Sequence, residues 1–225
     1  MPGSIKIDDG SGNYTILTNA GSLGSDKTLT IPNETATLAT TTATNLGGLV
    51  KLHSVTASNS SSVDFLFSDT GWTRSAYHSF IIKGRGITSV SDAVRLYGAF
   101  YSNSSLRSGT YQVAHYYKSS TTSDNGYAQD NDTDFIDFLD GTIGTDTREG
   151  CQLNVEVFPS GDSTSSSTIP TFFHSNLSAK YNGGQIYNVK SDGTFDSTSH
   201  INGMKFYMSS GNISTGEFDF YGVKR

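Results

Sequence analysis

Several features that usually identify the setting of a protein are scarce in this sequence. The 225 residues include a single cysteine, Cys151, so no disulfide can form within the chain. No apolar run approaches the ~20 residues that a membrane-spanning helix needs. The stretch MPGSIKIDDGSGN lacks the basic and apolar regions of a signal peptide. We therefore expect a soluble protein that is made in a cytoplasm without export.

Charge is also sparse. Charged residues make up 16% of the chain, the net charge is −6, and no run of basic residues occurs. These values argue against a nucleic-acid partner, because binding a phosphate backbone requires a basic surface. A sustained apolar period of 3.6 residues is missing as well, and the chain has only four prolines beside 24 glycines. This pattern favours strands and turns over helices.

Aromatic residues are plentiful, with 13 Phe and 12 Tyr, and they recur in segments where apolar and polar residues alternate. Turn-forming stretches rich in Ser, Gly, Asn and Asp separate these segments. Strands at this spacing predict an all-β fold, a jelly-roll-like antiparallel β-sandwich over residues 46–225. The expected strands are 49–56, 62–67, 77–84, 93–101, 110–118, 134–139, 151–158, 170–175, 185–190, 203–208 and 217–224.

Alternation also assigns faces to individual strands. The last strand places Phe218 and Phe220 on one side, which predicts that they close the core. Gly98 and Gly222 each follow an aromatic residue in the middle of a strand, where glycine marks a bulge or a close approach. We expect both to make room for a ring on a facing strand. The other core residues predicted in this way are Val63, Phe65, Phe67, Val94, Leu96, Phe100, Met204, Phe206 and Met208.

The N-terminal part differs from the rest. Residues 1–45 contain two short alternating units, each of which predicts a hairpin of two short strands, and they lead into the polar linker TTTATNLGG. Small hairpins are marginal alone, so this segment must pack against a sister chain, a larger assembly or the next domain. We interpret it as an anchor whose assembly contacts are Ile5, Ile7, Tyr14, Ile16, Leu29, Ile31 and Leu38.

Catalytic and metal-binding patterns fail at their diagnostic positions. Asp130, Asp132 and Asp134 have the spacing that opens a calcium loop, but an EF-hand would need Gly and Glu where Phe135 and Gly141 stand. A solvated acidic loop is the main interpretation, and a calcium site of another kind remains the alternative. Nucleophile elbows and phosphate-binding glycine loops do not occur. The sequence therefore predicts no catalytic residue, no cofactor and no metal.

For the other reactive side chains, the sequence pattern favours structural over catalytic roles. Cys151 alternates with apolar residues and is expected to be a small core residue. His78 and His115 lie in phase with apolar neighbours, which predicts buried histidines with hydrogen-bond partners. Glu156 is expected on a solvent-facing side of its strand. A dispersed Ser–His–Asp triad stays open, because its members need not be adjacent in sequence.

Exposed aromatic rings provide the remaining candidates for function. Tyr116, Tyr117 and Tyr127 flank a long polar loop, and at least one of the adjacent pair must face outward. Tyrosines beside Asp and Asn bind sugars in β-sandwich lectins, and they also occur at ordinary protein interfaces. Trp72 in DTGWTRS could likewise bind a sugar or lie at a protein interface. We consider these four residues candidate glycan or partner contacts, with packing in the core or an interface as the alternative.

Two stretches resemble a known group of proteins. They are the N-terminal run GSIKI, GNYTILTNAG and DKTLTIPNETATLAT, and the closing NISTGEFDFYGVKR. Together they cover about a quarter of the chain, and they are similar to segments of tail-fibre and virion structural proteins of tailed bacteriophages, notably marine ones. In that group the first run precedes the body of the protein, and the second forms the final strand of a β-sandwich.

The resemblance implies a non-enzymatic virion protein, homotrimeric, with an N-terminal anchor and an outward-facing sandwich. Its partners would be other virion proteins, further copies of itself and a host-surface glycan. The chain lacks the shaft of a long fibre, which favours a short tail appendage or a capsid decoration protein. A free carbohydrate-binding module and a small polysaccharide-degrading tailspike are the alternatives, and the second fits less well because the sequence has no β-helix repeats.

Overall fold

The computed structural model describes residues 4–8, 14–18, 48–102, 105–109, 111–120, 125–139, 141–160, 169–181, 184–197 and 200–225. The backbone alone is described for residues 4–8, 14–18, 125 and 132. The chain divides into two compact units, Met1–Thr44 and Asn45–Arg225.

The N-terminal unit contains one described sheet of two strands. Strand β1 (Ser4–Asp8) pairs antiparallel with β2 (Tyr14–Thr18), with Ile5 opposite Leu17 and Ile7 opposite Thr15. The first predicted hairpin is therefore confirmed. Four of the predicted anchor residues lie on these two strands, and Leu29, Ile31 and Leu38 lie outside the described residues.

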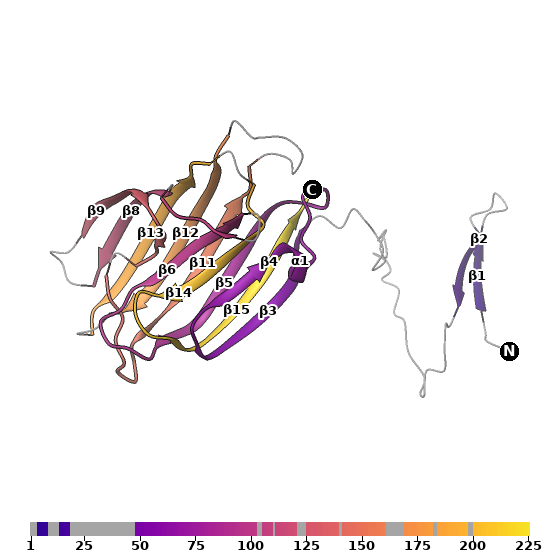
Figure 1. Ribbon diagram of the computed structural model, residues 1–225. Helices are drawn as coiled ribbons and strands as arrows, with labels where there is room; N and C mark the ends of the chain where they lie inside the picture. Colours follow the sequence, from indigo (N-terminus) through magenta and orange to yellow (C-terminus); the bar gives the residue numbers. More distant parts are fainter. Residues whose placement is uncertain are drawn as a thin grey trace. The chain divides into compact units, whose positions relative to one another are not determined.

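The second unit is a sandwich of two antiparallel sheets, as the alternation predicted (Figure 1). In the described part of the chain, the larger sheet has eight strands in the order β3-β15-β5-β11-β12-β13-β8-β9. They are β3 (Leu49–Ser60), β5 (Tyr77–Ser89), β8 (Tyr111–Ser119), β9 (Asn125–Thr133), β11 (Gly150–Phe158), β12 (Thr171–Lys180), β13 (Ile186–Phe195) and β15 (Ile213–Lys224).

The smaller sheet packs against one face of the larger one. Its strands follow the order β10-β6-β14-β4, and the two-residue β7 pairs with β6. These strands are β4 (Val63–Leu66), β6 (Leu96–Ser102), β7 (Ser105–Leu106), β10 (Ile136–Asp137) and β14 (Gly203–Met208), and a one-turn helix, α1 (Phe67–Thr70), follows β4. We call the face of the large sheet toward the small sheet its inner face, and the opposite face its outer face.

The core between the sheets is built largely from phenylalanine. Phe220 stacks on Phe80 with ring centroids 5.0 Å apart and on Phe65 at 5.4 Å. A Cβ added to Gly98 would lie 2.5 Å from the ring of Phe138, so this glycine admits the ring as predicted. Aromatic pairs at such separations add about 0.5–1.5 kcal/mol each beyond the area that they bury. The predicted core residues are buried, except that Phe67 lies in α1 and is partly buried against the core.

Two expectations about strands were wrong. The sequence predicts a polar loop after Tyr117 and an acidic loop at Asp130, but residues 125–133 form β9, which pairs with β8 at the edge of the large sheet. Asn, Gly and Asp have low strand propensity, and pairing with a neighbouring strand overrides it here. The stretch 134–139 contributes only Ile136 and Asp137 as a strand. His78 is exposed where the register between β5 and β15 shifts, so its predicted burial was also wrong.

Candidate binding face

A β-bulge interrupts the middle of the large sheet. Cys151 of β11 pairs with Ile87 of β5, but Leu153 pairs with Gly84, so two residues of β5, Arg85 and Gly86, stand opposite the single residue Gln152. Gly86 has a φ of 59°, the left-handed conformation that glycine adopts without strain. Bulges of this kind bend a sheet and redirect side chains, and they are frequent beside functional sites.

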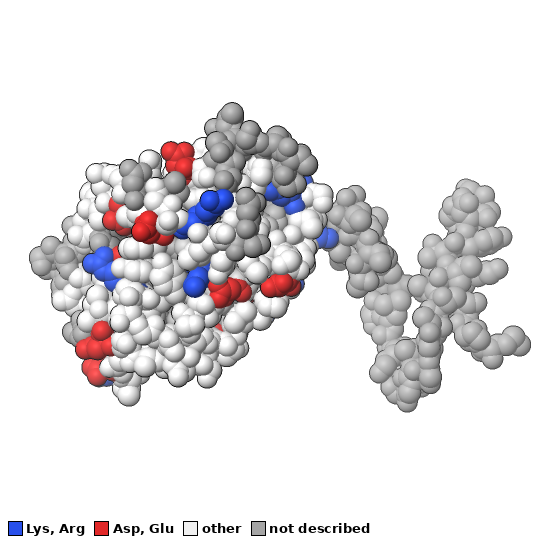
Figure 2. Space-filling view, in the orientation of Figure 1, with Lys and Arg blue, Asp and Glu red and all other residues white. Residues whose placement is uncertain are grey.

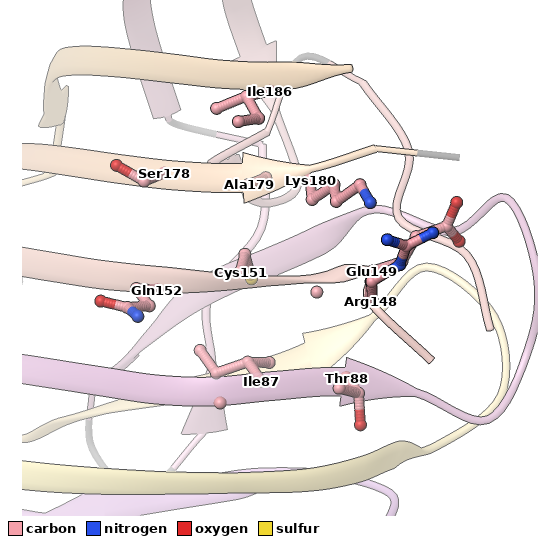
Figure 3. A pocket seen from close by; sticks show the side chains of 12 residues that line it. Ile87, Thr88, Arg148, Glu149, Cys151, Gln152, Ser178, Ala179, Lys180 and Ile186 are labelled. Atoms are coloured by element: carbon pink, nitrogen blue, oxygen red, sulfur yellow. The ribbon is translucent and has the colours of Figure 1, made fainter. Parts of the chain in front are cut away.

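Three hollows in the described surface meet at this bulge, and Gln152 lines all of them. The central hollow, of about 620 Å³, is lined by Lys83, Asn154, Asn176 and Tyr221 among others. A second hollow, of about 670 Å³, lies toward β3 beside Arg85 and Glu217. The third, of about 400 Å³, lies toward the ends of β11 and β12, and we call it the Arg148 pocket (Figure 3). Their sizes are those of small-ligand sites.

One row of polar and aromatic residues crosses the whole outer face. The residues are directly opposite one another from strand to strand, and they run in the order Ser54, Asp219, Lys83, Asn154, Asn176, Lys190, Tyr116 and Tyr127. Neighbouring strands are about 4.8 Å apart, so the row is roughly 34 Å long. The amide groups of Asn154 and Asn176 make no hydrogen bond to another described residue. The row therefore offers unused donors and acceptors to an extended ligand.

Ion pairs organise the charged end of this row. Lys51 Nζ lies 2.7 Å from Asp219 Oδ1, and Ser54 Oγ donates a hydrogen bond of 2.7 Å to the same oxygen. Lys51, through its hydrogen bond, lowers the pKa of Asp219 most, and Ser54 and Arg85 add to the effect. Arg85 Nε donates to Glu217 Oε2 at 2.6 Å, and this contact raises the pKa of Arg85. The pair with Lys51 therefore keeps the Asp219 carboxylate ionised at neutral pH.

The structure separates the four aromatic candidates. Tyr116 and Tyr127 lie together on the outer face with ring centroids 5.3 Å apart, and Tyr127 is 85% exposed. Tyr117 points to the inner side, where its ring lies over Gly126 and near Tyr187. Trp72 is only 3% exposed, packs on Phe67 and donates its indole N–H to Ser79 O. The interpretation of Trp72 as a surface contact was therefore wrong, because the ring is part of the core.

A Ser–His–Asp constellation is present, but it is closed from solvent. His115 Nδ1 lies 2.8 Å from Ser191 Oγ, and its Nε2 lies 3.2 Å from Asp130 Oδ2. Ser191 is only 1% exposed, so a substrate cannot reach its oxygen. The three residues form a hydrogen-bonded link across β13, β8 and β9, and the prediction that His115 is buried with partners is confirmed.

The remaining candidates for chemistry have structural roles. Cys151 is buried, and burial raises the pKa of its thiol to about 12, so it is a protonated core residue. Glu156 lies on the outer face and accepts a hydrogen bond of 3.1 Å from Ser79 Oγ. Among the described side chains no three His, Cys, Asp or Glu residues gather closely enough to hold a metal ion. The side chain of Asp132 is outside the described part of the chain.

Charge is mixed on the surface of the sandwich. On the face seen in Figure 2, acidic and basic side chains lie scattered among uncharged ones. No helix in the described ranges has both the length and the apolar character needed to cross a membrane. Comparison of the chain with models of protein families, with curated proteins and with solved structures finds no match.

The sequence did not indicate most residues of this face. Gln152, Arg85, Arg148 and Lys180 come from different elements, and only the strand register brings them together. One signal was present in the sequence. Gly84 and Gly86 in KGRG stand inside an alternating strand, where glycine often marks a bulge.

Proposed function

We propose that this chain is a non-enzymatic structural protein of a tailed-bacteriophage particle, a short tail fibre or similar appendage. Residues 1–45 attach it to the particle, and residues 46–225 form the displayed sandwich, which contacts the host surface. Its partners are other virion proteins, further copies of the chain in a homotrimer, and a host-surface glycan. No nucleic acid and no membrane insertion take part.

The division of the chain into two unequal units carries this proposal. The unit Asn45–Arg225 holds both sheets of the sandwich, whereas the described part of Met1–Thr44 holds one two-stranded sheet. A two-stranded sheet is marginally stable in water, so this unit gains from packing against another protein. A displayed virion protein needs one part that attaches to the particle and another that is stable alone. The N-terminal unit suits the first role, and the sandwich suits the second. The resemblance of the N-terminal run to phage virion proteins points the same way.

The outer face supplies the surface that such a protein would present. It combines the row from Ser54 to Tyr127 with the three hollows at the Gly86 bulge. Exposed amides, hydroxyls and tyrosine rings on one wide face suit a hydroxyl-rich polymer, because each sugar offers both hydroxyls to bond and an apolar face to stack.

Deletion of residues 1–45 tests the anchor. The isolated shortened protein is expected to melt cooperatively. When its gene is supplied to phage from which the full-length gene has been removed, the shortened protein is expected to be missing from the purified particles. The matched control is full-length protein with Tyr127→Ala, which is expected to be incorporated normally. Incorporation of the shortened protein would overturn the anchor assignment. A reconstruction of the particle then distinguishes a tail appendage from a capsid decoration protein by where the chain lies.

A free carbohydrate-binding module is the second candidate, and the exposed pair of Tyr116 and Tyr127 favours it. This candidate predicts a stable monomer that binds glycans on an array, with binding lost in Tyr116→Ala or Tyr127→Ala and retained in Tyr117→Phe. Sedimentation as an obligate trimer would count against it.

A further inference from the structure

The Arg148 pocket contains two cationic side chains, those of Arg148 and Lys180. Arg148 lies on the segment before β11, and Lys180 is the last residue of β12, opposite Gly150. Neither side chain makes an ion pair or hydrogen bond with another residue in the described parts of the chain. Figure 3 shows both at the same end of the pocket. In a chain with a net charge of −6, two cations on one small pocket that have no ion-pair partner among the described residues indicate an anionic ligand.

The pocket is larger than a bare anion requires. Its volume of about 400 Å³ leaves space for a ring beside the charged group. Ile186, which is 53% exposed, supplies an apolar wall. At the end of the pocket away from the cations lie Gln152 and Ser178, as Figure 3 shows. Ser178 Oγ donates to Asn188 at 2.7 Å and still has lone pairs to accept a hydroxyl proton.

The charge of the pocket selects among anions. Glu149 also lines it, and its carboxylate accepts the backbone N–H of Asp146 at 3.3 Å. Two cations and one carboxylate leave an excess of one positive charge, which matches a monoanion better than a doubly charged phosphate. A carboxylate also accepts two parallel hydrogen bonds from a guanidinium group, the geometry that arginine provides.

We propose that the Arg148 pocket binds an acidic sugar, with the sugar carboxylate between Arg148 and Lys180 and its ring against Ile186. The ring hydroxyls then reach Gln152 and Ser178, and through Gln152 the saccharide continues into the central hollow. This inference rests on the proposed function in one respect: a polysaccharide of the host surface is the source of the sugar.

Titration of the full-length protein with monosaccharides tests the proposal. D-glucuronate and D-galacturonate are compared with D-glucose and D-galactose, and amide NMR shifts report the binding site. The uronates are expected to shift the amides of Arg148, Lys180, Gln152 and Ser178, and the neutral sugars to bind at least about tenfold more weakly. Arg148→Gln and Lys180→Gln should each weaken uronate binding at least about tenfold. Melting curves confirm that the variants are folded.

Lys118→Gln is the matched control, because it removes an exposed positive charge from the same face outside the pocket, and it should leave uronate binding unchanged. Acetate and inorganic phosphate complete the series. Binding of either as tightly as the uronates would overturn the proposal in favour of a simple anion site. Equal binding of neutral sugars, unchanged binding in the Arg148 variant, or no binding of uronates would also overturn it. None of these results bears on incorporation into particles. The anchor proposal is therefore tested separately, by the deletion of residues 1–45.

Discussion

The ring of Tyr77 occupies the space where a side chain at position 222 would lie. A Cβ built on Gly222 would be 2.5 Å from Cδ1 of Tyr77, closer than carbon atoms approach in folded proteins. Gly222 lies on β15 and Tyr77 begins β5, so the contact joins neighbouring strands of the large sheet. Gly222 thus makes room for a ring as predicted, but the ring belongs to a neighbouring strand of the same sheet and not to a facing one.

Gly222→Ala should lower the free energy of unfolding by about 1–3 kcal/mol, because the added methyl group forces the Tyr77 ring or the strand to move. Urea denaturation of the sandwich measures the change. The double variant Tyr77→Ala/Gly222→Ala is the control, since removal of the ring removes the clash. The loss of unfolding free energy in the double variant should then be smaller than the sum of the losses in Tyr77→Ala and Gly222→Ala. Additive losses would mean that the ring does not restrict position 222.

Removal of residues 217–225 should unfold the sandwich. Strand β15 lies between β3 and β5, and Phe218 and Phe220 on it are fully buried. Loss of one buried phenylalanine costs about 3–5 kcal/mol, and a domain has a total stability of about 5–15 kcal/mol. Circular dichroism during heating should therefore show no cooperative transition. Deletion of Arg225 alone is the control and should melt normally. Soluble truncated protein that melts cooperatively would contradict the prediction.

Asp219 should make the sandwich less stable in acid. Its folded-state pKa lies below the ordinary value of 3.8, chiefly through the hydrogen bond from Lys51. A carboxyl group with a lowered pKa stabilises the fold above its unfolded-state pKa and loses that contribution as the pH falls through the folded value. The loss therefore occurs below about pH 4.

Urea denaturation at pH 6 and at pH 2.5 measures this effect. The difference in stability between the two values should be smaller in Asp219→Asn than in the unaltered protein. Lys51→Met should also reduce it, because it removes the main cause of the lowered pKa. An unchanged difference in both variants would show that the acid sensitivity comes from other groups.

The sequence predicted the fold well where large side chains alternate. Phe218 and Phe220 are an example, because only one face of a strand can enter a core and a shift of one residue would expose both. Strand β9 was missed for the opposite reason: Asn125, Gly126 and Gln129 show no apolar alternation, and the strand forms through its pairing with β8. Local composition therefore revealed the centre of the sandwich better than its edge.

The candidate site was harder to predict than the fold. Tyr116 and Tyr127 were identified because aromatic residues beside polar loops are conspicuous in any sequence. Trp72 was equally conspicuous, yet its indole N–H has a buried partner that sequence alone does not reveal. Arg148 and Lys180 line the same pocket because β11, which follows Arg148, pairs with β12 so that Gly150 lies opposite Lys180, and a register is a property of the assembled sheet.

Two serines on the neighbouring strands β12 and β13 provide a matched pair of tests on the inner face. Ser175 of β12 stands directly opposite Ser191 of β13, and both are buried. Ser191 Oγ bonds to His115, whereas Ser175 Oγ has no hydrogen-bond partner within the described residues. A buried hydroxyl without a partner costs free energy, and one with a partner contributes it.

Ser175→Ala should therefore raise the free energy of unfolding by about 0.5–2 kcal/mol, and Ser191→Ala should lower it by about 1–2 kcal/mol. The two substitutions remove the same atom from adjacent positions, so each controls for the change in volume of the other. Urea denaturation of both variants under identical conditions gives the comparison. Equal destabilisation by both would mean that the Ser175 hydroxyl is bonded after all, through a buried water molecule. Opposite signs would show that the hydrogen bond to His115, and not the packing of the serine itself, stabilises this part of the sheet.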